Sequence, residues 1–211
     1  MRILIIGASG VLGRATLPHL AGHDVTGTTR AADKCAGLVA LGARAEICDV
    51  YQADALARLA RTCAPDVVVN FLTDLAGGPG PSNSRIRREG GPIVTAAARA
   101  SGARRLLVES VAFATSGTPA AAVAALEEDA AASGLEVVIV RFGRFWGPGT
   151  WAESAPEPPA IHVAEAGRRA AALILAGRPG VHVVAEPSCE RDERAVRSPR
   201  SRTGGGVVDG G

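Results

Sequence analysis

Short runs of apolar residues alternate along this chain with longer segments in which apolar residues recur at helical spacing. The first run, residues 2–6, is typical of a strand buried on both faces, and further strands are predicted at residues 24–28, 45–48, 66–70, 105–109, 136–140 and 181–184. The longer segments predict helices at residues 11–21, 33–41, 54–62, 93–100, 120–133 and 164–176. Strands that alternate with helices in this way predict an α/β fold, a Rossmann-like doubly wound parallel sheet with right-handed crossovers.

Two segments break this alternation. Residues 76–82 are rich in glycine and proline, which predicts a mobile loop without helix or strand at the carboxyl edge of the sheet. Residues 188–211 mix arginines with acidic residues and end in glycine runs, a composition that cannot bury a core. We expect a disordered tail there, either solvated or in contact with an acidic partner.

Three glycines follow the first predicted strand and open the first predicted helix. Gly7 allows a tight turn, Gly10 lets the backbone approach a pyrophosphate, and Gly13 allows close packing of helix on strand. The start of the helix then presents free N–H groups to phosphates. The spacing is G-x-x-G-x-x-G, and its position in the opening βαβ unit predicts a dinucleotide site rather than a plain glycine-rich turn.

The end of the second predicted strand indicates which dinucleotide is bound. A site for NAD usually has a carboxylate at this point, whereas an arginine suits the 2′-phosphate of NADP. Arg30 occupies the position, so we expect NADP(H) to be preferred over NAD(H). Asp49, just past the third strand, is placed to accept from the adenine amino group, although an aspartate there is also ordinary turn chemistry.

Composition narrows the possible function classes. A net charge of +2 and an aromatic content of 3% argue against nucleic acid and anionic membrane surfaces as partners. The first apolar run meets a glycine at once and no long apolar run follows, so we expect neither a signal peptide nor a membrane span. The four cysteines are scattered without histidines at ligand spacing, which predicts reduced thiols in a cytoplasmic protein and no metal site.

The chain resembles the extended and atypical short-chain dehydrogenase/reductases, the family of NAD-dependent epimerases and dehydratases of nucleotide sugars. More narrowly, it is similar to a bacterial branch of epimerase-like proteins. The matching segments appear in family order and are residues 7–13, 71–75, 83–90, 109–114, 141–150 and 161–166. The resemblance implies a Rossmann core that binds NAD(P) and a carboxyl-terminal lobe that closes over a small-molecule substrate.

In that family the turns after the fourth, fifth and sixth strands face the nicotinamide. Here these turns are residues 72–73, 110–111 and 142–143. Together with the glycine motif and the strand ends, they give the expected cofactor-binding set: Gly7, Ser9, Gly10, Val11, Leu12, Gly13, Arg30, Asp49, Val50, Leu72 and Thr73.

The chain departs from the family at the usual Tyr-x-x-x-Lys pair. Tyr51 and Lys34 are its single tyrosine and single lysine, and both lie far from the helix that should carry the pair. Pro119 and Val123 occupy the two positions, or the two alanines one residue further on. In the family the tyrosine delivers a proton to the carbonyl and the lysine lowers its pKa. Ordinary carbonyl reduction would therefore lack its acid.

The substrate lobe is also expected to be small. A short proline-rich linker at residues 152–158 stands where relatives have a substantial segment, and the family pattern stops near residue 187. We therefore expect an NAD(P)-binding domain over residues 1–150, a reduced lobe that returns to the sheet over residues 151–187, and the tail over residues 188–211. The substrate cleft would be open, shallow, or completed by a second subunit.

Three residues are the candidate catalytic groups. Ser110 ends a central strand, where such sheets place their sites, unless the catalytic hydroxyl of the family aligns one residue on, with Val111. Glu127 could act as an acid or base if partly desolvated, or else lie on a solvated helix face. His162 titrates near neutrality and could be a general acid, or else a helix N-terminal residue that holds the lobe.

Other polar residues border the expected cleft. Glu109 could also supply an acid or base, and Arg141 and Arg144 could clamp an anionic substrate or pair with neighbouring carboxylates. A polar cluster on the bordering helix suits structure and substrate contact equally: Asn83, Arg87 and Glu89. Two cysteines are expected to fill the core: Cys48 and Cys63.

These observations favour a cytoplasmic NADP(H)-binding enzyme of the epimerase, dehydratase or reductase type that acts on a small metabolite. The abundance of alanine, glycine and arginine suggests a GC-rich bacterial gene of specialised biosynthesis. Two alternatives are a non-redox dehydratase, lyase or cyclase on the same scaffold, and a non-catalytic NADP(H) sensor. The alanine-rich faces of residues 93–100 and 120–132 favour a homodimer.

Overall fold

The computed structural model describes residues 1–74 and 80–186, and its centre is a sheet of seven parallel strands. The strand order is β3-β2-β1-β4-β5-β6-β9. The strands are β1 (Arg2–Ile6), β2 (Asp24–Thr29), β3 (Arg44–Ile47), β4 (Val67–Asn70), β5 (Arg105–Val111), β6 (Glu136–Phe142) and β9 (Gly180–Val184). The predicted doubly wound sheet is confirmed, with all seven predicted strands in it.

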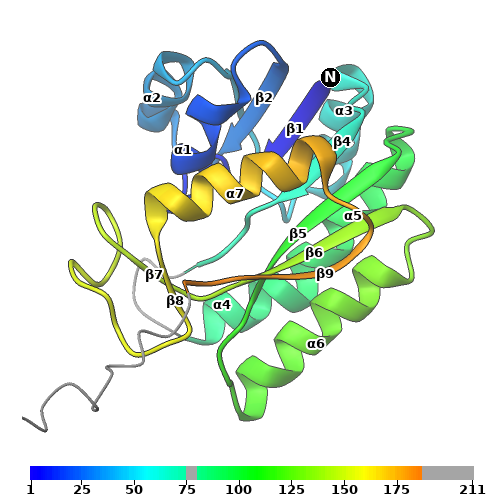
Figure 1. Cartoon of the computed structure of the whole chain (residues 1–211). Helices are drawn as coiled ribbons and strands as arrows, with labels where there is room; N and C mark the ends of the chain where they lie inside the picture. The colour runs from blue at the N-terminus through cyan, green and yellow to red at the C-terminus, as the bar shows by residue number, and fades with distance from the viewer. Residues whose placement is uncertain (75–79, 187–211) are drawn as a thin grey trace, which may run out of the picture.

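Helices cover both faces of the sheet (Figure 1). One face carries α1 (Val11–Thr16), α2 (Cys35–Ala40) and α7 (Val163–Ala176), with short 3-10 turns at η1 (Leu17–Leu20) and η2 (Ala32–Lys34). The other face carries α3 (Ala53–Cys63), α5 (Gly91–Ala100) and α6 (Gly117–Ala131). Successive residues of a strand point to opposite faces, so the middle of a strand that is covered on both sides is a continuous apolar run, as at residues 3–6, 67–69 and 106–108.

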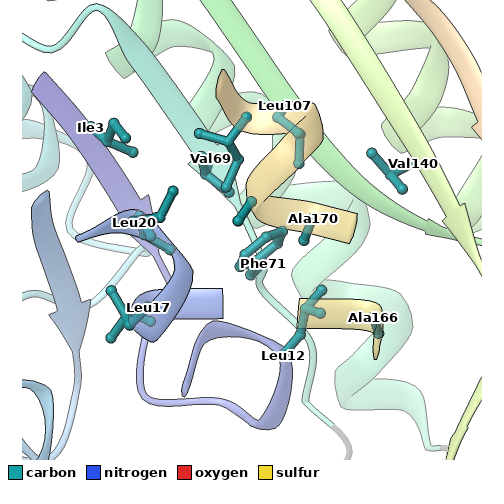
Figure 2. Packing of buried hydrophobic residues seen from close by; sticks show 14 of the residues in the cluster. Ile3, Leu12, Leu17, Leu20, Val69, Phe71, Leu107, Val140, Ala166 and Ala170 are labelled. Atoms are coloured by element: carbon teal, nitrogen blue, oxygen red, sulfur yellow. The ribbon is translucent and has the colours of Figure 1, made fainter. Parts of the chain in front are cut away.

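Two hydrophobic clusters result from this alternation. Ile3 and Ile5 of β1 belong to the cluster under α1 and α7, whereas Leu4 and Ile6 belong to the cluster under α3 and α5. Figure 2 shows the first cluster, where Leu12, Ala166 and Ala170 approach the strand residues. Helix α7 packs closely on α1 because residue 167 is a glycine, and a Cβ there would overlap the carbonyl of Ala15.

The chain around residue 81 differs from the prediction. Residues 76–79 of the expected loop lie outside the described residues, but Pro81 and Ser82 open a helix, so the expectation of no helix is wrong there. The helix expected at residue 93 starts here instead, as α4 (Pro81–Arg85), a π-helical segment η3 (Ile86–Gly90) and α5. Pro92 has no N–H to donate. The amide of Gly91 donates to the carbonyl of Ile86, five residues earlier, which is the hydrogen-bond spacing of a π-helix.

A small second sheet was not predicted. It pairs β7 (Arg144–Trp146) with β8 (Ala160–His162), and the intervening segment forms a surface loop. Helix α7 and strand β9 follow and belong to the layers of the main sheet, and the tail at residues 188–211 lies outside the described residues. Among the helices of the described ranges, none has the length and apolarity needed to cross a membrane.

Candidate functional site

Two adjoining cavities lie at the carboxyl edge of the sheet. The first has a volume of about 750 Å³ and the second about 470 Å³. They meet at a shared set of lining residues: Gly10, Val11, Phe71, Thr73, Gly149, Thr150 and Trp151. A doubly wound sheet binds its ligands at this edge, where the strand order reverses between β1 and β4.

The first two glycines of the motif line the first cavity. Gly7 has a φ of +85°, and a Cβ on it would lie 2.8 Å from the carbonyl oxygen of Phe71. Gly10 faces the cavity, and a Cβ there would meet only the carbonyl of Gly7 within 4 Å, so the backbone stays open to a ligand. At Gly13 a Cβ would overlap the backbone of Ala8, which is the close helix–strand contact expected of this position.

The expected cofactor-binding residues fall into three groups. Those that line the first cavity are Gly7, Ser9, Gly10, Val11, Arg30, Val50, Leu72 and Thr73. Leu12 lines the second cavity. Gly13 and Asp49 line neither, because Gly13 packs against the first strand–helix turn and Asp49 accepts the amide of Tyr51 at 3.1 Å.

Three basic side chains line the first cavity. Arg30 follows β2, and its Nη2 lies 4.0 Å from Oδ1 of Asp74 while more than half of the side chain stays exposed. Arg14 and Lys34 line the same cavity. Sequence reasoning missed these two residues. Arg14 lies one residue past the last glycine of the motif, and Lys34 lies on the turn after β2, so their positions were the available signals.

A partly buried polar cluster borders the second cavity. Ser110 lies at the end of β5 and donates a hydrogen bond to Oε1 of Glu127 on α6. Arg141 on β6 donates to both oxygens of the same carboxylate, from Nε at 3.0 Å and from Nη2 at 2.6 Å. The arginine, and secondarily the serine, holds the pKa of Glu127 below its usual range. Glu127 therefore lies behind Ser110 as a partly buried ion-pair partner, not on a solvated helix face.

Glu109 and Arg87 line the second cavity directly. Burial raises the pKa of Glu109 to about 7, and the nearby Arg87 opposes that rise. Arg87, on the π-helical segment, is itself buried, and its desolvation lowers the pKa of the guanidinium. The structure thus places a carboxyl group that titrates near neutrality next to a buried cation, in a cavity that adjoins the first.

His162 lies away from these groups and lines neither cavity. Its Nδ1 accepts the amide of Ala164 at 3.3 Å as the N-cap of α7, and its ring packs edge-on against Trp146. Glu186 holds both residues, since its carboxylate accepts the backbone amide of His162 and the indole N–H of Trp146. This arrangement corresponds to the lobe-holding alternative for His162.

The other candidates take varied positions. Arg144 lines the second cavity, with its guanidinium 4.6 Å from the ring centre of Phe113. Asn83 accepts the amide of Asp74 at 3.1 Å, and Glu89 pairs with Arg85 on the helix surface. The two expected core cysteines, Cys48 and Cys63, are partly buried and pack against the cluster on the α3 and α5 side.

The positions of the family's Tyr-x-x-x-Lys pair lie in the first two turns of α6, at Pro119 and Val123. Tyr51 packs beneath the guanidinium of Arg85 at 4.5 Å, and Lys34 lines the first cavity. Neither is among the residues that line the second cavity. No tyrosine or lysine within the described ranges therefore takes the place of the pair.

The strand order, the glycine turn and the paired cavities define a Rossmann-type nucleotide-binding protein. Residues 3–119, more than half of the chain, match the model of the NAD dependent epimerase/dehydratase family, and the chain belongs to that family. Its similarity to solved structures concerns the fold. WbmH from Bordetella bronchiseptica in complex with NAD⁺ aligns with a TM-score of 0.71 and 17% identity, over 87% of this chain and 75% of that one. UDP-glucose 4-epimerase of Thermus thermophilus in complex with NAD aligns with a TM-score of 0.72 and 18% identity, over 88% and 78%.

A curated relative is more similar in sequence. The 3-diazoavenalumate denitrifying reductase of a Streptomyces species is 32% identical over 180 residues, which cover 71% of this chain. The chain spans 58% of the length of that relative.

Proposed function

We propose that the chain is an NADP(H)-dependent reductase whose acceptor takes a hydride without a proton from a tyrosine. The observation that carries the proposal is the combination of an intact nucleotide cavity with a reaction cavity that has no tyrosine or lysine among its described lining residues. The family and its NAD-bound structural neighbours support a nicotinamide cofactor. Arg30 and Lys34 support a preference for the 2′-phosphate.

The residues present fit such a cofactor. The backbone at Gly10 is open where a pyrophosphate would lie, and α1, whose first amides have no acceptor within the helix, begins next to it at Val11. Ser9 donates to Thr29 at 2.9 Å, which ties the turn to the end of β2 beside Arg30. Leu72 and Thr73 line the cavity toward its junction with the second one, where the nicotinamide would bind.

An aryl diazonium is an acceptor that needs no tyrosine, and the word diazo in the name of the Streptomyces relative supports this choice. A bound reduced nicotinamide supplies a hydride, and an aryl diazonium that takes it at carbon releases dinitrogen with the carbon–nitrogen bonding pair. No oxygen becomes charged, so no proton donor is required. A carbonyl acceptor, in contrast, needs a proton on its oxygen as the hydride arrives.

The proposal is tested with a matched pair of acceptors. Benzenediazonium and benzaldehyde are each incubated with NADPH and the protein, and nicotinamide oxidation is followed beside benzene or benzyl alcohol formation. We expect protein-dependent conversion of benzenediazonium to benzene above the rate without protein, and none of benzaldehyde. Conversion of benzaldehyde alone, or of neither compound, would contradict the proposal.

A non-redox dehydratase or lyase is the second candidate, and Glu109 favours it. A carboxyl group with a pKa of about 7 in a cavity is suited to general acid–base chemistry. An enzyme of this kind would transform its substrate with no net change in nicotinamide absorbance.

A further inference from the structure

The second cavity is lined by most of the chain's large aromatic side chains. All four phenylalanines of the chain contribute to it, and so does Trp151, one of the two tryptophans. The phenylalanines come from separate segments and converge on this cavity: Phe71, Phe113, Phe142 and Phe145. In a chain with 3% aromatic residues, this convergence gives one cavity walls that suit flat, apolar ligands.

The aromatic walls have a defined arrangement. The rings of Phe142 and Phe145 are tilted by 58° with their centres 5.4 Å apart. Phe71 and Phe142 are almost fully buried, whereas Phe113 and Phe145 are partly exposed. A planar ring placed among them would make the offset or edge-to-face contacts that aromatic groups prefer.

Arg87 brings a charge into this apolar cavity. Its side chain is 4% exposed, and its Nη1 is fully buried without a hydrogen-bond partner in the described parts of the chain. The negative charges of Glu109 and Glu127 raise the pKa of Arg87 through space, but neither carboxylate is within ion-pairing distance of the guanidinium. Burial of an unpaired guanidinium costs folding free energy. Its presence here therefore indicates that a ligand supplies the missing hydrogen-bond acceptor and negative charge.

Arg144, the other arginine of the cavity, is already engaged. It is exposed, its guanidinium stacks over Phe113, and its Nη1 donates to the carbonyl of Glu157 at 3.3 Å. Ser110 donates its hydroxyl proton to Glu127. Of the two arginines that line the cavity, Arg87 is therefore the one that is free to bind an anionic group.

We propose that the second cavity binds a planar aromatic carboxylate, with its ring among the phenylalanines and its carboxylate on Arg87. A single buried guanidinium matches the single charge of a carboxylate and its two oxygens, whereas a phosphate dianion would bring more charge than the cavity neutralises. The volume of about 470 Å³ accommodates one or two fused rings. The proposal rests on the proposed function, because it assigns the acceptor's class at the same site.

Binding of 2-naphthoate to the protein, with and without NADP⁺, tests the proposal. Two matched probes separate its parts, since 2-naphthamide keeps the flat ring without the charge and decahydro-2-naphthoate keeps the charge without the flat ring. We expect 2-naphthoate to bind at least tenfold more tightly than either. Equal binding of 2-naphthoate and 2-naphthamide would overturn the role of a charge in the cavity. Equal binding of 2-naphthoate and its saturated counterpart would overturn the role of the aromatic walls.

Variants locate the carboxylate. Arg87→Gln should weaken 2-naphthoate at least tenfold and leave 2-naphthamide unchanged. Arg88→Gln is the control, because Arg88 is exposed on the same helix and does not line the cavity. An Arg87→Gln protein that binds 2-naphthoate as the wild type does would overturn the assignment. The comparison of acid and amide on the wild-type protein keeps the proposal testable should the variant not fold.

The test of carboxylate binding at the second cavity can fail or succeed independently of the test of the proposed reductase. NADPH titration of the same proteins reports on the first cavity, which Arg87 does not line. Nucleotide binding without any preference for the acid over the amide would overturn this inference alone. Tight, Arg87-dependent binding of 2-naphthoate without any nucleotide binding would support the inference and contradict the reductase.

Discussion

Arg30 and Asp74 face each other at the first cavity, with 4.0 Å between Nη2 of the arginine and Oδ1 of the aspartate. Both side chains are partly exposed, so the pair is weak. The arginine is thereby available to a 2′-phosphate, but the same aspartate would lie near that phosphate and repel it.

Removal of this carboxylate should strengthen NADPH binding. In Asp74→Asn we expect the Kd for NADPH to fall by about threefold, the size of an exposed charge interaction, with little change for NADH. Fluorescence titration at low and high salt measures the effect, which should shrink as salt screens it. Asp54→Asn on exposed α3 is the control. Weaker NADPH binding in Asp74→Asn would mean that Asp74 supports the nucleotide.

The glycine motif offers a matched pair of substitutions. Gly13→Ala forces a methyl group into the backbone of Ala8 and should cost at least about 2 kcal/mol of unfolding free energy. Gly10→Ala meets only the carbonyl of Gly7, so the fold should be nearly as stable while nucleotide affinity falls at least tenfold. Urea unfolding and NADPH titration separate the two effects. An unchanged affinity in Gly10→Ala would place the pyrophosphate elsewhere.

Glu109 should make the free energy of unfolding fall as pH rises above the pKa that this group has in the unfolded chain. Its folded pKa of about 7 exceeds the ordinary value of 4.5, so the folded state holds a proton that the unfolded state has lost. Stability from this group is full below pH 4.5 and is lost as pH rises through 7, by about 3 kcal/mol. Denaturant unfolding at pH 5 and pH 8 measures this loss.

Glu109→Gln should remove most of that difference, and Glu128→Gln, exposed on α6, should leave it intact. Glu127 and Glu165 have pKa values below the usual range, and their contribution is lost only as pH falls. These two groups therefore do not contribute to the change in unfolding free energy between pH 5 and pH 8. A pH-independent wild type would contradict the raised pKa of Glu109.

The Glu127–Arg141 pair should couple α6 to β6. Arg141 is exposed by 42%, so its bidentate bond to Glu127 is partly screened, and we expect Glu127→Gln to cost about 1 kcal/mol of unfolding free energy. Arg141→Gln should cost a similar amount, and the double variant little more than either. A double-mutant cycle measures the coupling. Fully additive costs would show that the pair contributes nothing.

The sequence predicts the central strands well because both of their faces are buried, so runs such as residues 67–69 are apolar throughout. The sequence does not predict α4 and η3, where a polar segment is helical. Ile86 and Ser84 of this segment are buried by tertiary packing, and the hydrogen-bond register changes before Pro92. The short strands β7 and β8 pair across a loop, and local patterning carries no signal for such pairing.

The first cavity is largely predictable because most of its residues lie on one contiguous motif and on strand ends. The second cavity is not. Arg87 appears in the sequence as one of several arginines on a polar helix, and only the fold shows that it is buried at a cavity lined by four phenylalanines from three separate parts of the chain. Glu127 likewise looks like a surface residue until Arg141 and Ser110 are placed beside it.

Titration of the protein with NADPH and with NADH, followed by nicotinamide fluorescence and by melting temperature together, tests the central claim most directly. We expect tight NADPH binding, weaker NADH binding, and a loss of that preference in Arg30→Ala. Absence of binding for both nucleotides would contradict the proposed reductase outright.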